Sequence, residues 1–226
     1  MVKSLLGLIG GVALLFWGVY MVKTGMLRTF GVALQKGLAR ALHNRVNGFA
    51  AGFGLSTLLQ SSTAAGLLVA GLQAENVVTT AIAISTILGA ELGSAFVACV
   101  LSFNFEAFAP LFIAAGVIIF FAKKPQTRQG QFGRILLGIG FIMVAIGQIV
   151  AATGPLRTVQ DVLPYFEALA LCPFLCFSAG ALLALASLSS LAAVIVCASL
   201  VAAQVLSLTS GFWIVLGANA GSTLLS

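Results

Sequence analysis

Two short polar groups interrupt apolar segments of this chain, and their residue types suit the binding of small ions. The first group is Gln60-Ser61-Ser62-Thr63, and the second contains the pair Ser189-Ser190. Where a membrane helix breaks, the half-helix that follows presents free N–H groups and a partial positive charge, so that neighbouring hydroxyls favour an anion. Amide and carbonyl oxygens, such as that of Gln60, are ligands for a hard cation such as Na⁺. The two groups therefore predict a site for small ions.

Two glycine-rich elements further along the chain carry additional oxygen ligands. Gly89–Ser94 holds Glu91, the only acid deep inside an apolar run, and Gly217–Thr223 holds Asn219 at the equivalent position. A carboxylate at membrane depth is costly, so Glu91 is a candidate functional residue, and a purely structural role is the alternative. The glycines allow the backbone either to unwind or to pack closely. We expect a broken transmembrane helix at each element.

The elements that carry these residues have the composition of membrane helices. Of the 226 residues, 61% are hydrophobic and only 7% are charged, whereas a soluble domain carries about 25% charged residues. The apolar runs approach roughly 20 residues, the length that crosses a bilayer core about 30 Å thick, and they are apolar all round. The sequence thus predicts an all-α polytopic membrane protein.

Charge and motif content exclude two other classes of function. The net charge is +6, but the basic residues lie between apolar segments and form no basic face interleaved with aromatic residues. We therefore expect no nucleic-acid partner, and we interpret the basic residues as a topology signal. The sequence contains no nucleophile–base pair, phosphate-binding loop, dinucleotide motif or zinc-ligand spacing. Neither an enzyme nor an organic cofactor is expected.

Apolar segments follow one another along the whole chain. They are Ser4–Val22, Gly48–Leu72, Val77–Ser102, Phe108–Ala122, Phe132–Ala152, Leu169–Leu208 and Phe212–Ser226. A basic connector over 23–45 follows the first segment, and a second basic loop over 123–134 precedes the fifth.

The second half of the chain repeats the first. Residues 24–29 recur as residues 153–158 at an offset of 129, and an offset of 128 then holds without a gap. The features that align at this second offset are Phe49 with Phe177, Gly52 with Gly180, Ser61-Ser62 with Ser189-Ser190, Ala64-Ala65 with Ala192-Ala193, and the two glycine-rich elements. Six features in the same order indicate a tandem duplication.

The charges predict opposite orientations for the two copies. Connector 23–45 has five Lys or Arg residues and no acid, whereas its counterpart 152–170 has Arg157 alone against Asp161 and Glu167. The positive-inside rule makes the first connector cytoplasmic and the second external. Equivalent segments on opposite sides of a membrane form an inverted-topology repeat, the architecture of many secondary transporters.

The number of membrane crossings between two cytoplasmic segments must be even, and this requirement predicts a hairpin in each copy. Loop 123–134 is basic and hence cytoplasmic like connector 23–45, so an even number of crossings separates them. A re-entrant helical hairpin at 48–72, with its tip at the serine group, satisfies this requirement. We expect a first repeat over 1–130 and a second over 131–226, whose hairpin lies at about 176–200 and whose C-terminal part is incomplete.

The motifs resemble those of a known family. Leu59–Ala64 resembles the Q-S-S-S/T signature of the sodium-dependent phosphate cotransporters, the type II Na/Pi cotransporters and their bacterial relatives. Leu88–Ser94 and Leu216–Thr223 resemble the G-A-N-x-G-T-T element of the same family, and the resemblance covers most of the chain. Two departures stand out, since the second serine pair lacks the Gln and the third hydroxyl, and Glu91 replaces the usual Asn.

The resemblance implies Na⁺-coupled symport of inorganic phosphate by alternating access, with the two serine groups lining a shared site. Phosphate is expected on hydroxyls and backbone N–H groups, with little direct help from Lys or Arg. The expected phosphate ligands are Ser61, Ser62, Ser189 and Ser190. The expected Na⁺ ligands are Gln60, Thr63, Glu91, Ser94, Asn219, Ser222 and Thr223.

Location and partners follow from the same interpretation. The chain is expected to be a multi-pass protein of the bacterial inner (plasma) membrane, with Na⁺ and phosphate as its ligands and the lipid bilayer around it. A homodimer and a PhoU-like regulatory domain or protein remain open as partners. Two other functions also remain open: Na⁺-coupled transport of another oxyanion or an organic anion, and a non-transporting sensor or assembly subunit.

Overall fold

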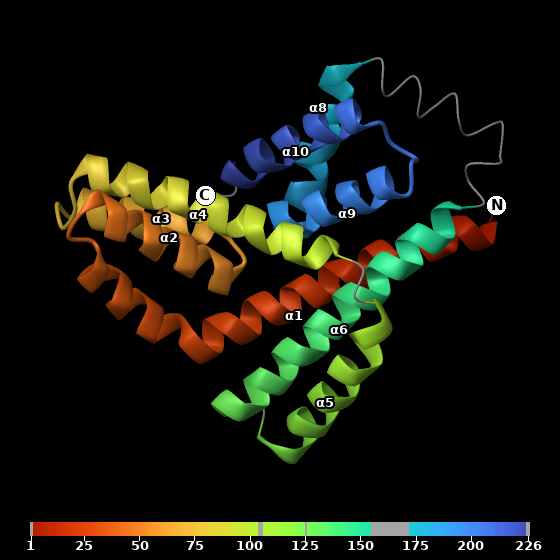
Figure 1. Ribbon diagram of the computed structural model, residues 1–226, viewed down its shortest axis with the longest axis horizontal. Coiled ribbons are helices and arrows are strands. Elements are labelled where there is room, and N and C mark those ends of the chain that lie inside the picture. Colours follow the sequence, from red (N-terminus) through yellow and green to blue (C-terminus); the bar gives the residue numbers. More distant parts are fainter. Residues whose placement is uncertain (1, 104–105, 125, 155–171, 225–226) are drawn as a thin grey trace.

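The architecture is helical throughout the part of the chain that the structure describes. This computed structural model describes residues 2–103, 106–124, 126–154 and 172–224, with the backbone alone over 31–41, and every regular element in these ranges is a helix (Figure 1). The elements are α1 (Val2–Ala41), α2 (Arg45–Leu59), α3 (Ser62–Ala74), α4 (Thr80–Ser102), η1 (Glu106–Phe108), α5 (Ala109–Ala122), α6 (Arg128–Thr153), α8 (Pro173–Ser187), α9 (Ser190–Ala202) and α10 (Leu208–Thr223). The predicted all-α class is confirmed for these residues.

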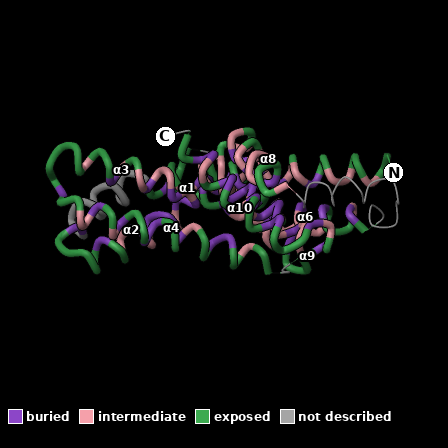
Figure 2. The backbone as a smooth tube through the Cα atoms, turned by 90° about the horizontal axis from the view of Figure 1, so that it is seen from above, coloured by how far each residue is buried: buried purple, intermediate pink, exposed green. Residues whose placement is uncertain are grey.

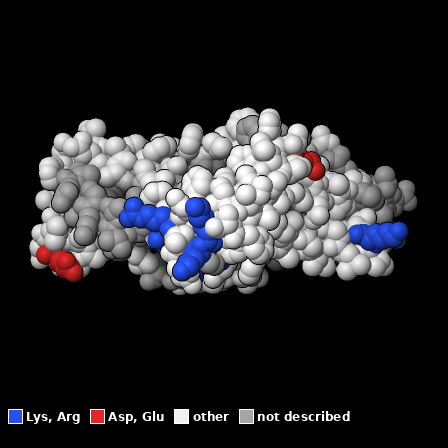
Figure 3. Space-filling model, turned by 90° about the horizontal axis from the view of Figure 1, so that it is seen from below, with Lys and Arg blue, Asp and Glu red and all other residues white. Residues whose placement is uncertain are grey.

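Three of the described helices are long and apolar enough to cross a membrane. They are Val2–Phe30 within α1, Thr80–Ser102 and Arg128–Thr153. Helices α3, α8 and α9 and the segment Glu106–Ala122 are apolar but shorter. One face of the molecule carries only a few charged side chains, separated by wide uncharged surface (Figure 3). Such a surface fits a lipid environment.

Helix α1 is longer than the sequence predicts. It runs for 40 residues, so the segment expected to be a connector continues the same helix as far as Ala41. The residues before and after Lys23 are apolar or small, which is why the helix does not end where the first charge appears. The basic residues at 23–41 therefore lie on a helix and not in a loop.

Helices α1 and α6 pack against each other in opposite directions. Gly11, near the start of α1, faces Ile149, near the end of α6, and Gly25 faces Ile135. Between these contacts the backbones approach closely at Gly18 and Gly138, where an added Cβ would lie 2.9 and 2.7 Å from the carbonyl oxygen of the other glycine. This small-residue contact is a typical way to join membrane helices.

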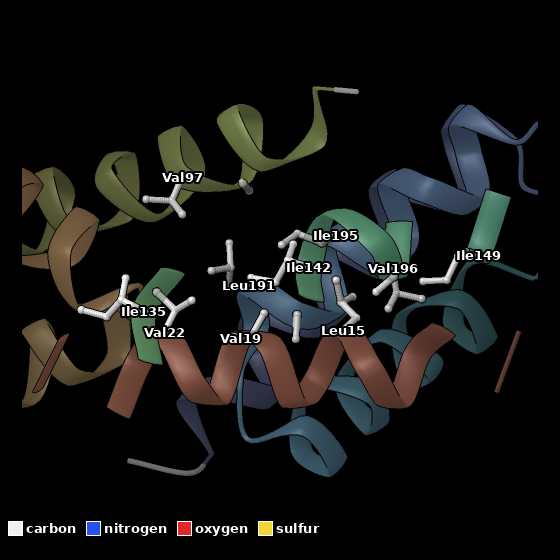
Figure 4. Close-up of a cluster of buried hydrophobic side chains, with 13 residues drawn as sticks. Leu15, Val19, Val22, Val97, Ile135, Ile142, Ile149, Leu191, Ile195 and Val196 are labelled. Atoms are coloured by element: carbon white, nitrogen blue, oxygen red, sulfur yellow. The ribbon is translucent and has the colours of Figure 1, made fainter. Parts of the chain in front are cut away.

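A hydrophobic core forms along this contact and extends to α9 (Figure 4). Leu15, Val19 and Ile142 are at most 2% exposed, and Leu191 and Ile195 of α9 belong to the same cluster. Figure 2 shows buried residues gathered around α9, which packs against both α6 and α10. The core thus links the α1–α6 pair to the second half of the chain.

Each copy of the repeat contains a helical hairpin followed by a third helix. Gly48 and Gly52 of α2 face residues 82–86 of α4, and Phe53 faces Gly93, so α2 and α4 run in the same direction. Helix α3 joins the end of α2 to the start of α4 and therefore runs in the opposite direction beside this pair (Figure 1). Helices α8, α9 and α10 repeat this arrangement, with Gly180 against Ile214. Two consecutive helices joined by a short turn thus lie in each half of the chain, and the predicted re-entrant geometry remains a prediction.

The predicted broken helices are wrong. Helix α4 continues through Gly89–Ser94 and α10 continues through Gly217–Ser222. A Cβ added at Gly89 would overlap the carbonyl oxygen of Phe49, and one at Gly217 would overlap that of Phe177. The glycines serve close helix packing and do not unwind the backbone.

One charge argument falls outside the described part of the chain. Connector 152–170, with Arg157, Asp161 and Glu167, lies almost entirely outside the described residues. The orientation that its charges predict remains a prediction.

Candidate ion site at the hairpin tips

The two hairpin tips have the same backbone conformation. Gln60 ends α2 in the left-handed region at φ 51° and ψ 37°, and Leu188 ends α8 at φ 51° and ψ 30°. The turns after each hairpin also match, because Asn76 and Gln204, again 128 residues apart, have φ of 57° and 53°. The duplication seen in the sequence is therefore present in the backbone, and the predicted break at Gln60 is confirmed.

Ser61 and Ser189 begin the returning helices in the same way. Both are N-caps with extended backbone, and their Oγ atoms accept hydrogen bonds from Ala64 N at 3.2 Å and Ala192 N at 3.3 Å. Local N-capping by serine explains why α3 and α9 start where they do. Each Oγ accepts from its own helix, so its hydroxyl proton can point outward to an acceptor.

A cavity of about 280 Å³, which we call the serine cavity, lies between the two tips. Its polar lining comes from both copies and from α1. The lining residues are Lys23, Gln60, Ser61, Thr63, Ala64, Leu67, Leu188, Ser189, Ser190 and Ser222. The structure thus brings together six of the predicted site residues, five from hairpin tips 128 positions apart in the sequence and Ser222 from α10.

Gln60 lines this cavity and carries a buried polar atom without a described partner. The residue is only 7% exposed, and its Oε1 atom has no hydrogen-bond partner among the described residues. A buried amide oxygen without a partner costs about 1–3 kcal/mol, and a ligand that donates to it or coordinates it removes that cost. A lining residue of this cavity therefore carries an unused acceptor atom, beside the hydroxyl donors of the serines.

A second, smaller cavity of about 100 Å³ gathers the remaining acidic and amide candidates. Glu91 and Ser94 of α4 and Asn219 of α10 line it together with Ser190. Ser190 lines both cavities, so the two cavities lie next to each other. The oxygen-rich set, with one carboxylate, suits a cation.

Two predicted ligands lie outside these cavities, and two others have hydroxyls bonded within their own helices. Ser62 is buried and Thr223 is exposed, and neither lines these two cavities. The hydroxyls of Ser94 and Ser222 donate to the carbonyls of Glu91 and Asn219 in their own helices, each at 2.9 Å. These hydroxyls can still offer their oxygens to a cation.

Lys23 is the residue of this site that sequence reasoning missed. Its charge is counted with connector 23–45 as a topology signal, whereas the structure places it on α1 at the wall of the serine cavity. The signal in the sequence is that Lys23 lies within one continuous helical span, Val2–Phe30, with an apolar stretch on its N-terminal side. A lysine inside such a span is a functional candidate by default.

These features define a helical membrane protein in which two copies of one hairpin motif enclose a polar cavity. The sequence model of one family, described as Na⁺/Pi-cotransporter, matches residues 14–151 and 159–226. The chain belongs to this family, as its motifs predict.

The chain is also similar to curated proteins whose names mention inorganic phosphate. The chain is 40% identical over 223 residues to proteins named putative inorganic phosphate export protein YjbB from Escherichia coli K12, Escherichia coli O157:H7 and Salmonella typhimurium LT2. The match covers 99% of this chain and 41% of each relative, so the chain spans less than half the length of these proteins. No solved structure matches.

Proposed function

We propose that this chain is the transporting unit of a Na⁺-coupled carrier of inorganic phosphate. The observation that carries the proposal is the cavity between two equivalent serine-capped hairpin tips. Secondary transporters bind their substrate near the bilayer midplane between repeats, at the ends of helices. The family of the chain and the names of its relatives support phosphate as the substrate.

In this proposal the phosphate oxygens accept hydrogen bonds from the tip hydroxyls. Ser61 and Ser189 approach from the two copies, Ser190 adds a third hydroxyl, and the N-termini of α3 and α9 add N–H groups and favourable dipoles. Ser62 is retained in the proposal because it directly follows the cap of α3, and its backbone N–H belongs to the first turn.

Na⁺ occupies oxygen-rich positions beside the anion in this proposal. Gln60 and Thr63 coordinate it from the serine cavity, and Glu91 and Asn219 coordinate it from the smaller cavity. The remaining proposed ligands are Ser94, Ser222 and Thr223. A cation at this distance from the anion offsets its charge, which makes the binding of both ions cooperative.

Alternating access follows from an inverted arrangement of the two copies. Support comes from α1 and α6, which are equivalent in the repeat and pack in opposite directions. We propose that in a bilayer the tips of α2–α3 and α8–α9 approach the site from opposite sides, as re-entrant hairpins. We propose a cytoplasmic location for connector 23–45 and loop 123–134, in a bacterial inner membrane.

Net phosphate export is the second candidate, and the names of the relatives favour it. A Na⁺ symporter moves phosphate in whichever direction the sum of the two gradients dictates. With an inward Na⁺ gradient, export by symport requires a steep outward phosphate gradient. The two candidates thus share a binding site and differ in the gradient under which phosphate flows.

Reconstitution in liposomes tests the proposal. Labelled phosphate should enter faster under an inward Na⁺ gradient than in Na⁺-free medium, and vesicles loaded with Na⁺ and labelled phosphate should release label when external Na⁺ is removed. Phosphate flux that ignores Na⁺ in both directions refutes the coupling. Stronger competition by sulfate, arsenate or a carboxylate than by phosphate assigns another anion. The absence of both flux and any ligand-dependent thermal shift supports a non-transporting subunit.

A further inference from the structure

Lys23 lies in the serine cavity without a described acidic partner. It is half-buried, and its neighbours Met21 and Val22 are buried. Across the described residues no carboxylate forms an ion pair with it; the acid that lines the neighbouring cavity, Glu91, is not part of the Lys23 cavity. An ammonium group within an apolar span is costly unless an anion or water compensates its charge.

The position of Lys23 breaks the symmetry of the site. The serine hydroxyls come in equivalent pairs from the two copies, but at the repeat offset of 129 the position equivalent to Lys23 is Ala152. An anion between the tips therefore meets hydroxyls from both copies and a full positive charge from one. A role of Lys23 in anchoring the end of a membrane helix does not explain its position, since Lys23 lines the cavity between the two tips.

We propose that the Lys23 ammonium is the fixed counter-charge of the bound anion and donates hydrogen bonds to it. This inference rests on the proposed function and deepens it, because it assigns to the protein a positive charge that a coupling cation would otherwise supply. Gln60 Oε1, buried and without a described partner, then accepts a hydrogen bond from the hydroxyl of a protonated phosphate or from the Lys23 ammonium group. A divalent or monovalent oxyanion is the expected occupant.

The consequence is that phosphate binds to the chain without Na⁺. Hydrogen bonds to charged groups are about twice as strong as neutral ones, so removal of the ammonium should be most costly when no Na⁺ is present. We expect Lys23→Met to weaken phosphate binding in Na⁺-free buffer by at least about tenfold, and by less at saturating Na⁺. Methionine keeps most of the apolar stem, which limits any loss of packing.

The experiment is a binding titration with inorganic phosphate on the purified chain in detergent, with Na⁺ or with N-methylglucamine as the cation. Lys23→Arg should retain most of the Na⁺-free binding. Lys3→Gln is the matched control, because Lys3 lies on the same helix, is exposed and lines neither cavity, and it should bind like the unmodified chain. Acylation of the unmodified chain gives a second test: phosphate should slow the labelling of Lys23 and not that of Lys3.

The outcomes separate the inference from the function on which it rests. Equal Na⁺-free affinity in Lys23→Met and the unmodified chain, or labelling of Lys23 unaffected by phosphate, overturns the inference. Binding of phosphate only when Na⁺ is present also overturns it but leaves Na⁺-coupled transport standing. No binding under any condition refutes the proposed function itself. The labelling test needs no variant, so misfolding of Lys23→Met does not remove the test.

Discussion

The close contact between α2 and α4 holds the first hairpin in place, and Gly52→Ala should break it. The Cβ of an alanine at this position would overlap the carbonyl oxygen of Thr86, far inside the 3.0 Å that real Cβ atoms keep from their neighbours. Side-chain rotation cannot relieve the overlap, because the obstacle is backbone and Cβ has no rotamer. The two helices must therefore separate.

The size of the effect follows from the required displacement. Restoring an allowed distance moves the helices apart by more than ~1 Å, and such a gap forfeits a quarter to a half or more of the dispersion energy along the contact. Overpacking of a core typically costs about 1–3 kcal/mol, and we expect a value at or above about 3 kcal/mol because backbone meets backbone. The Gln60–Ser61 tip at the end of α2 moves with the helix, so phosphate transport should fall as well.

The assay compares the thermal stability of Gly52→Ala with that of Gly54→Ala in the same detergent. Gly54 lies on the same helix, and an added Cβ there meets nothing within 4 Å. Gly54→Ala should be neutral or stabilise the protein by up to about 1 kcal/mol, because alanine is the better helix former. Equal melting temperatures for the two variants would refute the close-contact reasoning.

Three further predictions concern the tips and the smaller cavity. Ser61→Ala and Ser189→Ala should each lower the free energy of unfolding by about 1 kcal/mol, because each removes an N-cap. The double variant should also abolish phosphate flux. A flux like that of the unmodified chain would contradict the proposed site. Leu188→Gly should raise the melting temperature, because a left-handed conformation costs a non-glycine residue about 1–2 kcal/mol, which exceeds the entropy cost of glycine. Glu91→Gln should raise the Na⁺ concentration for half-maximal flux by about tenfold, while Glu75→Gln, at a residue that is exposed like Glu91 but lines neither cavity, should not.

Local chemistry explains why the hairpin tips could be predicted from the sequence. A serine at a helix start and polar residues within an apolar run act within a few residues of chain, so the break at Gln60 can be read directly. The match between the two copies then extends this break to Leu188, although its side chain alone gives no such signal. The duplication therefore predicts the second tip, which the helix propensity of the residues around Leu188 does not predict.

The continuity of α4 and α10 could not be predicted, because it depends on a partner far away in the sequence. Gly89 is compatible with an unwound helix as well as with close packing, and its own neighbours do not decide between them. The carbonyl oxygen of Phe49, 40 residues earlier, occupies the space that a Cβ would need. Glu91 and Asn219 therefore face the smaller cavity from intact helices, where their carbonyls remain bonded within the helix.

Lys23 could not be recognised as a site residue from the sequence, because the positive-inside rule already accounted for its charge. The positive-inside rule counts basic residues near helix ends, and Lys23 qualifies only if the helix ends before it. Because α1 continues to Ala41, the lysine lies within the span and beside the Ser189 tip, which belongs to the other copy. A duplicated fold supplies matched hydroxyls to both sides of a ligand, but an unpaired charge has to come from a position where the copies have diverged. At Lys23 and Ala152 they have diverged, so the charge balance of this site cannot be deduced from its symmetry.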